Sequence, residues 1–129
     1  MAKILVVDDS ELICMYLEET LDKSGHQVII ARDGLAGVKA ADENKDIELI
    51  ILDFGMPQMD GVTMAKKIRE IPELAEIPML MLTTESNPIV KEEGKKAGIW
   101  AWISKPLIAE KLTKTVDNAL EQYRSVKSA

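Results

Sequence analysis

One pattern occurs five times along the chain: a short apolar run, an acidic or glycine-containing corner, and a stretch with helical amphipathic spacing. The apolar runs are residues 4–7, 28–31, 49–52, 79–82 and 99–103. The third run is apolar without interruption, which is typical of a strand that is covered on both faces. Strands that alternate with helices in this way predict an α/β fold, with a parallel sheet, helices on both faces and right-handed crossovers.

Residues that cap or break helices mark the expected helix boundaries. A helical pattern begins at Ser10. Asp60 and Asn87 can each cap the helix that follows them, and Gly25 and Gly98 can each end one. The longest apolar stripe at helical spacing lies near the C-terminus, and its members are Ile108, Leu112, Val116, Leu120 and Tyr123. Residues 125–129 are expected to fray, so we predict one domain over residues 1–124 and a short tail over 125–129.

The composition restricts the class of function. The chain has 129 residues, of which 47% are hydrophobic and 29% charged, as expected of one soluble globular domain. No run approaches the roughly 20 apolar residues that a membrane span needs. The first residues put only a short apolar run before two acids, so we do not expect export. The single Cys14 cannot form an internal disulfide, which fits the cytoplasm. Sixteen basic against 22 acidic residues argue against direct binding of nucleic acid.

Polar side chains that could share one site follow the first, third, fourth and fifth apolar runs. Asp8 and Asp9 follow the first run, Asp53 the third, Thr83 the fourth and Lys105 the fifth. In an open parallel sheet, ligands bind beyond the carboxyl ends of the strands, so these side chains are expected to converge there. Carboxylates that share a site repel one another, and a bound cation relieves the repulsion. Carboxylate oxygens suit Mg²⁺, Mn²⁺ or Ca²⁺ rather than zinc, and no Cys/His cluster competes.

Two other α/β phosphate sites are excluded by the motifs that they need. The sequence has neither GxGxxG after the first run nor GxxxxGK[ST], and its first corner, VDDSE, would repel a phosphate unless a metal intervened. A metal-dependent phosphotransferase or phosphatase that acts on an external substrate stays open as an alternative. The chain offers neither a DxD nucleophile motif nor an insertion that would build a substrate pocket for such an enzyme.

Four motifs in order, VVDDS, ILDFGMPQMDG, MLTTE and SKP, resemble the receiver domain of two-component response regulators. The resemblance spans essentially the whole chain, and within the family it is greatest to the short, single-domain CheY-like kind. It implies a doubly wound, flavodoxin-like (βα)5 sandwich with strand order 2-1-3-4-5. A receiver that is a fragment of a longer regulator remains a second alternative.

The resemblance also implies a Mg²⁺ site, which Mn²⁺ could also fill. It makes Asp9 the principal metal-binding carboxylate, with Asp8 acting mainly through a metal-bound water. Asp53 and the backbone carbonyl of Gly55 complete the protein ligands. Gly55 stands where the family often has a polar residue, so this chain has no side chain there to shield a phosphoryl group.

By the same resemblance, Asp53 accepts a phosphoryl group from a sensor histidine kinase or a phosphotransfer protein. Lys105 would pair with Asp53 and then with the phosphoryl group, while Thr83 would donate its hydroxyl to a phosphoryl oxygen. The receiver would catalyse its own phosphorylation and dephosphorylation without being a turnover enzyme. Phosphorylation would then change the surface of the fourth helix, fifth strand and fifth helix toward a target protein, with control of chemotaxis or motility as one output.

Trp102 occupies the position of the aromatic residue that, in this family, moves together with the threonine. The alternative is that Trp102 simply packs on a helix, because Trp100 lies two residues earlier on the same expected strand face. Gly94 is expected to loosen its helix by about 1 kcal/mol relative to alanine. His26 is interpreted as a turn residue far from the site and Cys14 as a residue on the flank of its helix. Glu85 is interpreted as a solvated acid at a helix start.

Overall fold

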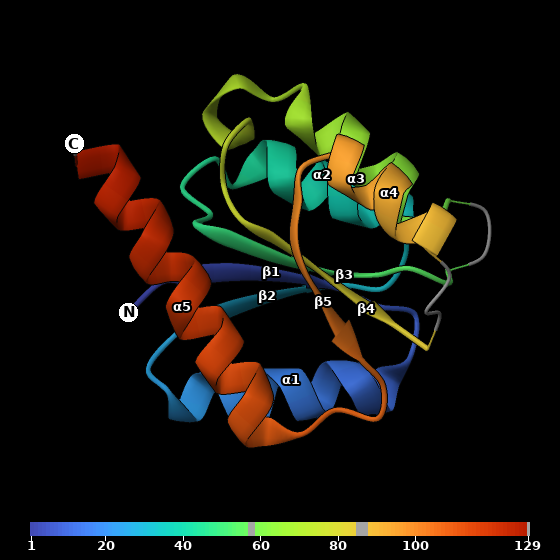
Figure 1. Cartoon of the computed structure of the whole chain (residues 1–129). Helices are drawn as coiled ribbons and strands as arrows, with labels where there is room; N and C mark the ends of the chain where they lie inside the picture. Colours follow the sequence, from blue (N-terminus) through green and yellow to red (C-terminus); the bar gives the residue numbers. More distant parts are fainter. Residues whose placement is uncertain (57–58, 85–87, 129) are drawn as a thin grey trace.

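The computed structural model describes residues 1–56, 59–84 and 88–128, which form alternating strands and helices (Figure 1). The strands are β1 (Lys3–Val7), β2 (Gln27–Ala31), β3 (Leu49–Asp53), β4 (Met79–Thr83) and β5 (Ile99–Ser104). The helices are α1 (Glu11–Lys23), α2 (Gly34–Glu43), α3 (Gly61–Arg69), the short 3-10 helix η1 (Pro72–Leu74), α4 (Pro88–Lys96) and α5 (Ala109–Ser128). All five predicted strands and the helices between them are therefore confirmed.

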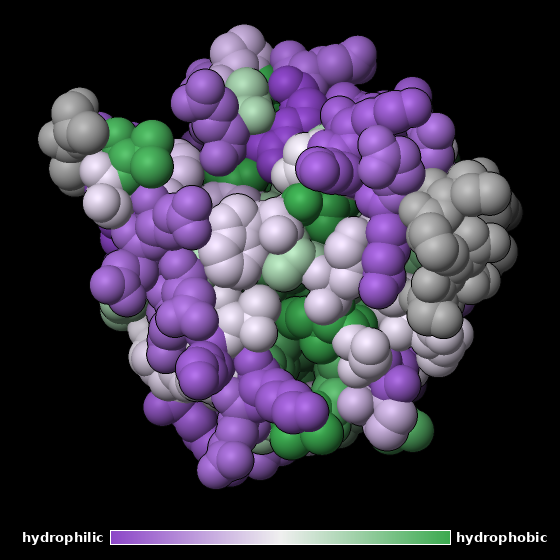
Figure 2. All heavy atoms as spheres, in the orientation of Figure 1, coloured by the Kyte–Doolittle hydropathy of each residue, from purple (hydrophilic) through white to green (hydrophobic). Residues whose placement is uncertain are grey.

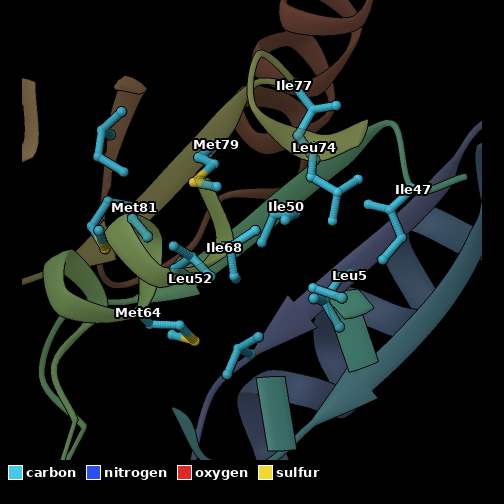
Figure 3. Packing of buried hydrophobic residues seen from close by; sticks show 14 of the residues in the cluster. Leu5, Ile47, Ile50, Leu52, Met64, Ile68, Leu74, Ile77, Met79 and Met81 are labelled. Carbon is cyan, nitrogen blue, oxygen red and sulfur yellow. The ribbon is translucent and has the colours of Figure 1, made fainter. Parts of the chain in front are cut away.

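The five strands form one parallel sheet in the order β2-β1-β3-β4-β5, as the resemblance implied. Helices α1 and α5 cover one face, and α2, α3 and α4 cover the other (Figure 1). Alternate strand residues point to opposite faces, so the buried side chains divide into two clusters. Figure 3 shows the cluster on the α2–α3–α4 side, where Met64 and Ile68 of α3 pack over Leu52 of β3. No described helix is long and apolar enough to cross a membrane.

Local side chains and glycines set the helix boundaries. The Ser10 hydroxyl accepts a hydrogen bond from the Ile13 amide at 3.3 Å, and the Asp60 carboxylate accepts one from the Thr63 amide at 2.8 Å. The predicted cap at Asp60 is therefore confirmed, Ser10 is a further cap, and Asn87 lies outside the described residues. Gly25 and Gly98 end helices with φ angles of 86° and 83°, a left-handed conformation that a side chain would strain.

The expected fraying of the C-terminal tail is wrong over residues 125–128, because α5 continues through Ser128. Arg124 holds this part of the helix against the start of the sheet. Its guanidinium pairs with Glu48, with Nε 3.1 Å from Oε2, and Nη2 donates to the Met1 carbonyl at 2.8 Å. Ala129 lies outside the described residues.

Two residues of the first βα unit are more buried than the sequence suggested. Cys14, expected on the flank of α1, is buried together with Leu17, and its Sγ donates to the Asp8 carbonyl at 3.2 Å. His26 lies in the loop before β2, as expected, but it too is buried, and its Nδ1 accepts a hydrogen bond from the Ala2 amide at 3.0 Å. Both side chains therefore serve packing and local hydrogen bonding.

Candidate functional site

Three carboxylates meet at the carboxyl ends of β1 and β3, where the sequence placed them. Asp8 and Asp9 directly follow β1, and Asp53 is the last residue of β3. Each of the three offers an oxygen, and these oxygens all lie within 4.8 Å of one another. Asp8 and Asp53 are buried and Asp9 is exposed, so the cluster is open to solvent on the Asp9 side.

Asp8 is the fully buried member of the cluster. Its Oδ1 accepts a hydrogen bond from the Ser10 amide at 2.8 Å, whereas its buried Oδ2 accepts none. Burial raises the pKa of Asp8, and the charge of Asp53 raises it further, although the Ser10 amide and Lys105 act in the opposite direction. A buried carboxylate oxygen without a hydrogen-bond donor, beside two more acids, is a site that a hard divalent cation fits.

Lys105 brings the compensating positive charge. Its Nζ lies 3.1 Å from Asp53 Oδ1, as a hydrogen bond, and 3.4 Å from Asp8 Oδ2, as an ion pair. Burial acts to lower the pKa of Lys105, but the Asp53 hydrogen bond and the two carboxylate charges outweigh it, so the pKa is raised. The Lys105 amide donates to the Thr83 carbonyl at 3.0 Å, which ties this loop to the end of β4.

The other predicted residues border the cluster. Thr83 is the last residue of β4 and is buried. The Gly55 amide donates to Asp53 Oδ1 at 3.3 Å, so Asp53 Oδ1 accepts from both Gly55 and Lys105. Among the described residues, no atom lies within 4 Å of a Cβ built at Gly55.

Two further residues that support the cluster were not found from the sequence. Arg32 Nη2 donates to the Asp9 backbone carbonyl at 3.0 Å and so fixes the loop after β1. A Cβ at Gly61 would lie 2.7 Å from the Asp53 carbonyl, so the start of α3 can approach β3 only because residue 61 is glycine. From the sequence, Asp60 is expected only as a helix cap.

The two tryptophans have different environments. Trp102 is half-buried, and its ring lies 6.1 Å from that of Phe54, with an angle of 57° between the ring planes. Phe54 directly follows Asp53, so an aromatic pair adjoins the carboxylate cluster. Trp100 is 40% exposed and has no partner in the β4–β5 register, which shifts between Met79 and Leu80. Glu85 lies outside the described residues.

This arrangement suits chemistry on a highly charged group such as a phosphoryl group. Asp53 presents a carboxylate that the Gly55 amide and the Lys105 ammonium hold in place. Phosphoryl transfer demands mainly positioning and neutralisation of charge, and a carboxylate can act as the nucleophile. The site supplies one such nucleophile, one fixed positive charge and a set of oxygens suited to a divalent cation.

Comparison with known proteins gives consistent matches over almost the whole chain. The family described as "Response regulator receiver domain" matches residues 4–117. The chain is 34% identical over 119 residues to the chemotaxis protein CheY1 of Helicobacter pylori, covering 92% of this chain and 96% of that protein. It is also 34% identical over 120 residues to the protein PilH of Pseudomonas aeruginosa, covering 93% of this chain and 98% of that protein.

Among solved structures, that of the chemotaxis protein CheY4 of Vibrio cholerae superposes with a TM-score of 0.89 at 39% sequence identity. The match covers 92% of this chain and 98% of that one. The residues that the family matches, 4–117, include every strand end that carries a residue of the cluster.

Proposed function

The chain belongs to the response regulator receiver domain family, and on this basis we propose that it is a phosphorylation-controlled switch with Asp53 as its phosphoacceptor. The observation that carries the proposal is the placement of the Asp53 carboxylate. It is buried, it lies 3.1 Å from the Lys105 ammonium, and it belongs to a cluster with two further acids. A purely structural ion pair would have no use for the additional carboxylates, because they repel Asp53.

The donor set fits Mg²⁺ or Mn²⁺. The carboxylates of Asp8, Asp9 and Asp53, with the backbone carbonyl of Gly55, would hold the cation, and Asp8 would act mainly through a water molecule. Asp8 Oδ2 accepts no hydrogen bond and has only the ion pair with Lys105 at 3.4 Å, which supports this assignment, because a cation or its water would satisfy that buried oxygen. A bound cation supplies positive charge that offsets the repulsion among the acids and attracts the phosphoryl oxygens.

In the proposed reaction, an Asp53 carboxylate oxygen forms a bond to phosphorus. The bond between phosphorus and the donor breaks, and its electron pair stays with the donor, an imidazole nitrogen when the donor is a phosphohistidine. Lys105, which already contacts Asp53, neutralises the new anion. Thr83 donates its hydroxyl to a phosphoryl oxygen from the end of β4. The chain thus catalyses its own modification and is not a turnover enzyme.

The partners follow from this reaction. The phosphodonor would be a sensor histidine kinase or a phosphotransfer protein of the cytoplasm. The output would pass through the surface of α4, β5 and α5 to a target protein. On the face that Figure 2 shows, hydrophilic side chains cover α5, and hydrophobic side chains gather between α5 and α4. The relatives named as chemotaxis proteins make chemotaxis or motility the output that we propose.

Acetyl phosphate with Mg²⁺ tests the phosphoacceptor directly. The wild-type protein should gain the mass of one phosphoryl group, in a form that is stable to acid and labile to base. The Asp53→Asn variant should gain none, because an amide is a poor nucleophile. Asp33→Asn is the matched control, since Asp33 is exposed and caps α2, a role that asparagine also fills. Undiminished phosphorylation of Asp53→Asn at another residue would overturn the proposal.

A further inference from the structure

Gly94, in α4, is buried against the indole ring of Trp102. A Cβ built at Gly94 would lie far inside contact distance of Trp102 Cζ2, and it would lie 3.2 Å from Cη2 and 3.3 Å from Cε2. Of the described glycines, only Gly25 and Gly98 have a positive φ, so the backbone conformation does not require glycine at position 94. The indole ring therefore occupies the space that any other side chain at this position would fill.

The same ring also lies against the residue that follows Asp53. The Trp102 ring makes a tilted contact with Phe54, whose backbone amide donates to the Leu82 carbonyl at 2.9 Å. Trp102 is also the register partner of Met81 in the β4–β5 pair. One side chain thus connects the residue after Asp53 with the last turn of α4.

We propose that Gly94 is a positioning residue: it forms the seat of the Trp102 indole and thereby couples the position of α4 to the state of Asp53. The coupling, unlike the seat, rests on the function proposed above. Because the ring and the helix backbone interlock, neither can move toward the other, and a displacement of the ring must change the packing of α4. A modification of Asp53 shifts the equilibrium between two positions of the Trp102 ring only if the modified carboxylate makes different contacts in each. Phe54 can transmit this difference, because it follows Asp53 in the chain and contacts the Trp102 ring.

The seat is tested in a Trp100→Phe background, where Trp102 is the only remaining tryptophan. Gly94→Ala should displace the ring toward solvent. Its emission should shift to longer wavelength, and its quenching by acrylamide should increase. Lys95→Ala is the matched control on the same helix, because Lys95 is exposed and its truncation leaves the seat intact. If the emission and quenching of Gly94→Ala equal those of the Trp100→Phe parent, the proposal that Gly94 positions the Trp102 indole is overturned.

A double variant distinguishes a steric clash from any other need for glycine. If Gly94→Ala is destabilised or fails to fold, combining it with Trp102→Leu should restore the stability of the Trp102→Leu single variant, because the atoms that clash are gone. The stability losses of the two substitutions should then be strongly non-additive. Simple addition of the two losses would show that Gly94 serves a purpose unrelated to Trp102 and would overturn the proposal.

The coupling is tested with acetyl phosphate and Mg²⁺ in the same background. Gly94→Ala should still gain one phosphoryl group, because Asp53 and its contacts are untouched, but the accompanying change in Trp102 fluorescence should be lost. A change as large as in the parent would overturn the coupling. Absence of phosphorylation in the parent itself would instead refute the proposed function, while the emission and double-variant results would still decide the seat.

Discussion

At the residue scale, the carboxyl group of Asp8 opposes the stability of the metal-free fold at neutral pH. It is fully buried, and only one of its oxygens accepts a hydrogen bond. Burial and the charge of Asp53 raise its pKa above 3.8, which means that the fold favours the neutral form. The stability that the neutral Asp8 carboxyl contributes is therefore fully present below pH 3.8, and it is lost as the pH rises through the raised pKa.

Replacing Asp8 by asparagine should consequently stabilise the metal-free protein. The amide oxygen can still accept the Ser10 amide hydrogen, and the buried charge disappears. The expected gain at pH 7 is about 1 kcal/mol in the free energy of unfolding, or roughly 3–6 °C for a domain of this size. Urea unfolding in the presence of EDTA measures it, and the gain should shrink as the pH is lowered toward 3.8. A less stable variant at pH 7 would show that the Lys105 ion pair outweighs the burial of the charge.

His26 gives the opposite dependence on pH. Burial lowers its pKa below 6.5, and the N-terminal ammonium and Arg124 act in the same direction, whereas Asp117 and Glu48 oppose them. Its Nδ1 accepts the Ala2 amide hydrogen and can do so only while that nitrogen is unprotonated. Stability should therefore be fully present above pH 6.5 and should fall as the pH drops toward the lowered pKa.

The variant His26→Asn separates this effect from the rest of the titration. The asparagine oxygen can accept the Ala2 amide hydrogen in place of Nδ1, but it does not titrate. Between about pH 7 and 5, the free energy of unfolding of the variant should fall less steeply than that of the wild type. Equal slopes for the two proteins would assign the acid sensitivity to other groups.

The residues of the carboxylate cluster could be predicted from the sequence because each follows a strand, and parallel strands bring their ends to one edge. The burial of Cys14 and His26 could not be predicted in this way. Ile13 and Cys14 differ by only one position on the helix, and the contact of the Cys14 sulfur with the Asp8 carbonyl depends on the loop after β1. The burial of His26 depends on the backbone amide of Ala2, for which the sequence carries no signal.

At the scale of elements, Arg69 joins three parts of the fold that the hydrophobic pattern does not connect. It lies at the end of α3, and its guanidinium donates to four backbone carbonyls. The acceptors are Leu74 at 3.1 Å, Ala75 at 3.0 Å, Ala97 at 3.4 Å and Gly98 at 2.8 Å. Two of these carbonyls lie at the end of η1 and two in the turn between α4 and β5.

Truncation of Arg69 to methionine should cost about 1–3 kcal/mol in the free energy of unfolding, because partly buried carbonyls lose their donors. Arg69→Lys should recover only part of the loss, since an ammonium cannot span four acceptors in the plane of a guanidinium. Lys67→Met on the same helix is the control, because Lys67 is exposed. Chemical unfolding gives all three values, and a loss no greater than in the control would make Arg69 a surface residue without structural effect.

Helix and strand boundaries were largely predictable, because caps and glycines act locally. The packing of α4 against β5 was not predictable in this way. Gly94 was expected only to loosen its helix, whereas the structure uses its missing side chain to admit Trp102. The register shift in β5 that leaves Trp100 unpaired has no counterpart in the apolar run 99–103, which is continuous in the sequence. Features of this kind depend on contacts between elements, and the spacing of apolar residues in the sequence does not predict them.

At the scale of the whole molecule, the acid cluster connects cation binding to global stability. The three carboxylates lie at the ends of β1 and β3, which pair with each other in the interior of the sheet. The unfolded chain cannot hold these oxygens together, so any affinity for a divalent cation belongs to the folded state alone. Binding must then stabilise the fold in proportion to the logarithm of the cation concentration.

We therefore expect Mg²⁺ at about ten times a dissociation constant of about 1 mM to add roughly 1.4 kcal/mol to the free energy of unfolding. Thermal unfolding at increasing Mg²⁺ measures the effect. Asp9→Ala should lose most of this gain without losing metal-free stability, because Asp9 is the exposed member of the cluster. Monovalent salt at the same ionic strength is the control, since the chain has a net charge of −6 and screening alone reduces its self-repulsion. If monovalent salt reproduces the whole gain, or if Asp9→Ala keeps it, the stabilisation arises from screening and the cluster does not bind the cation.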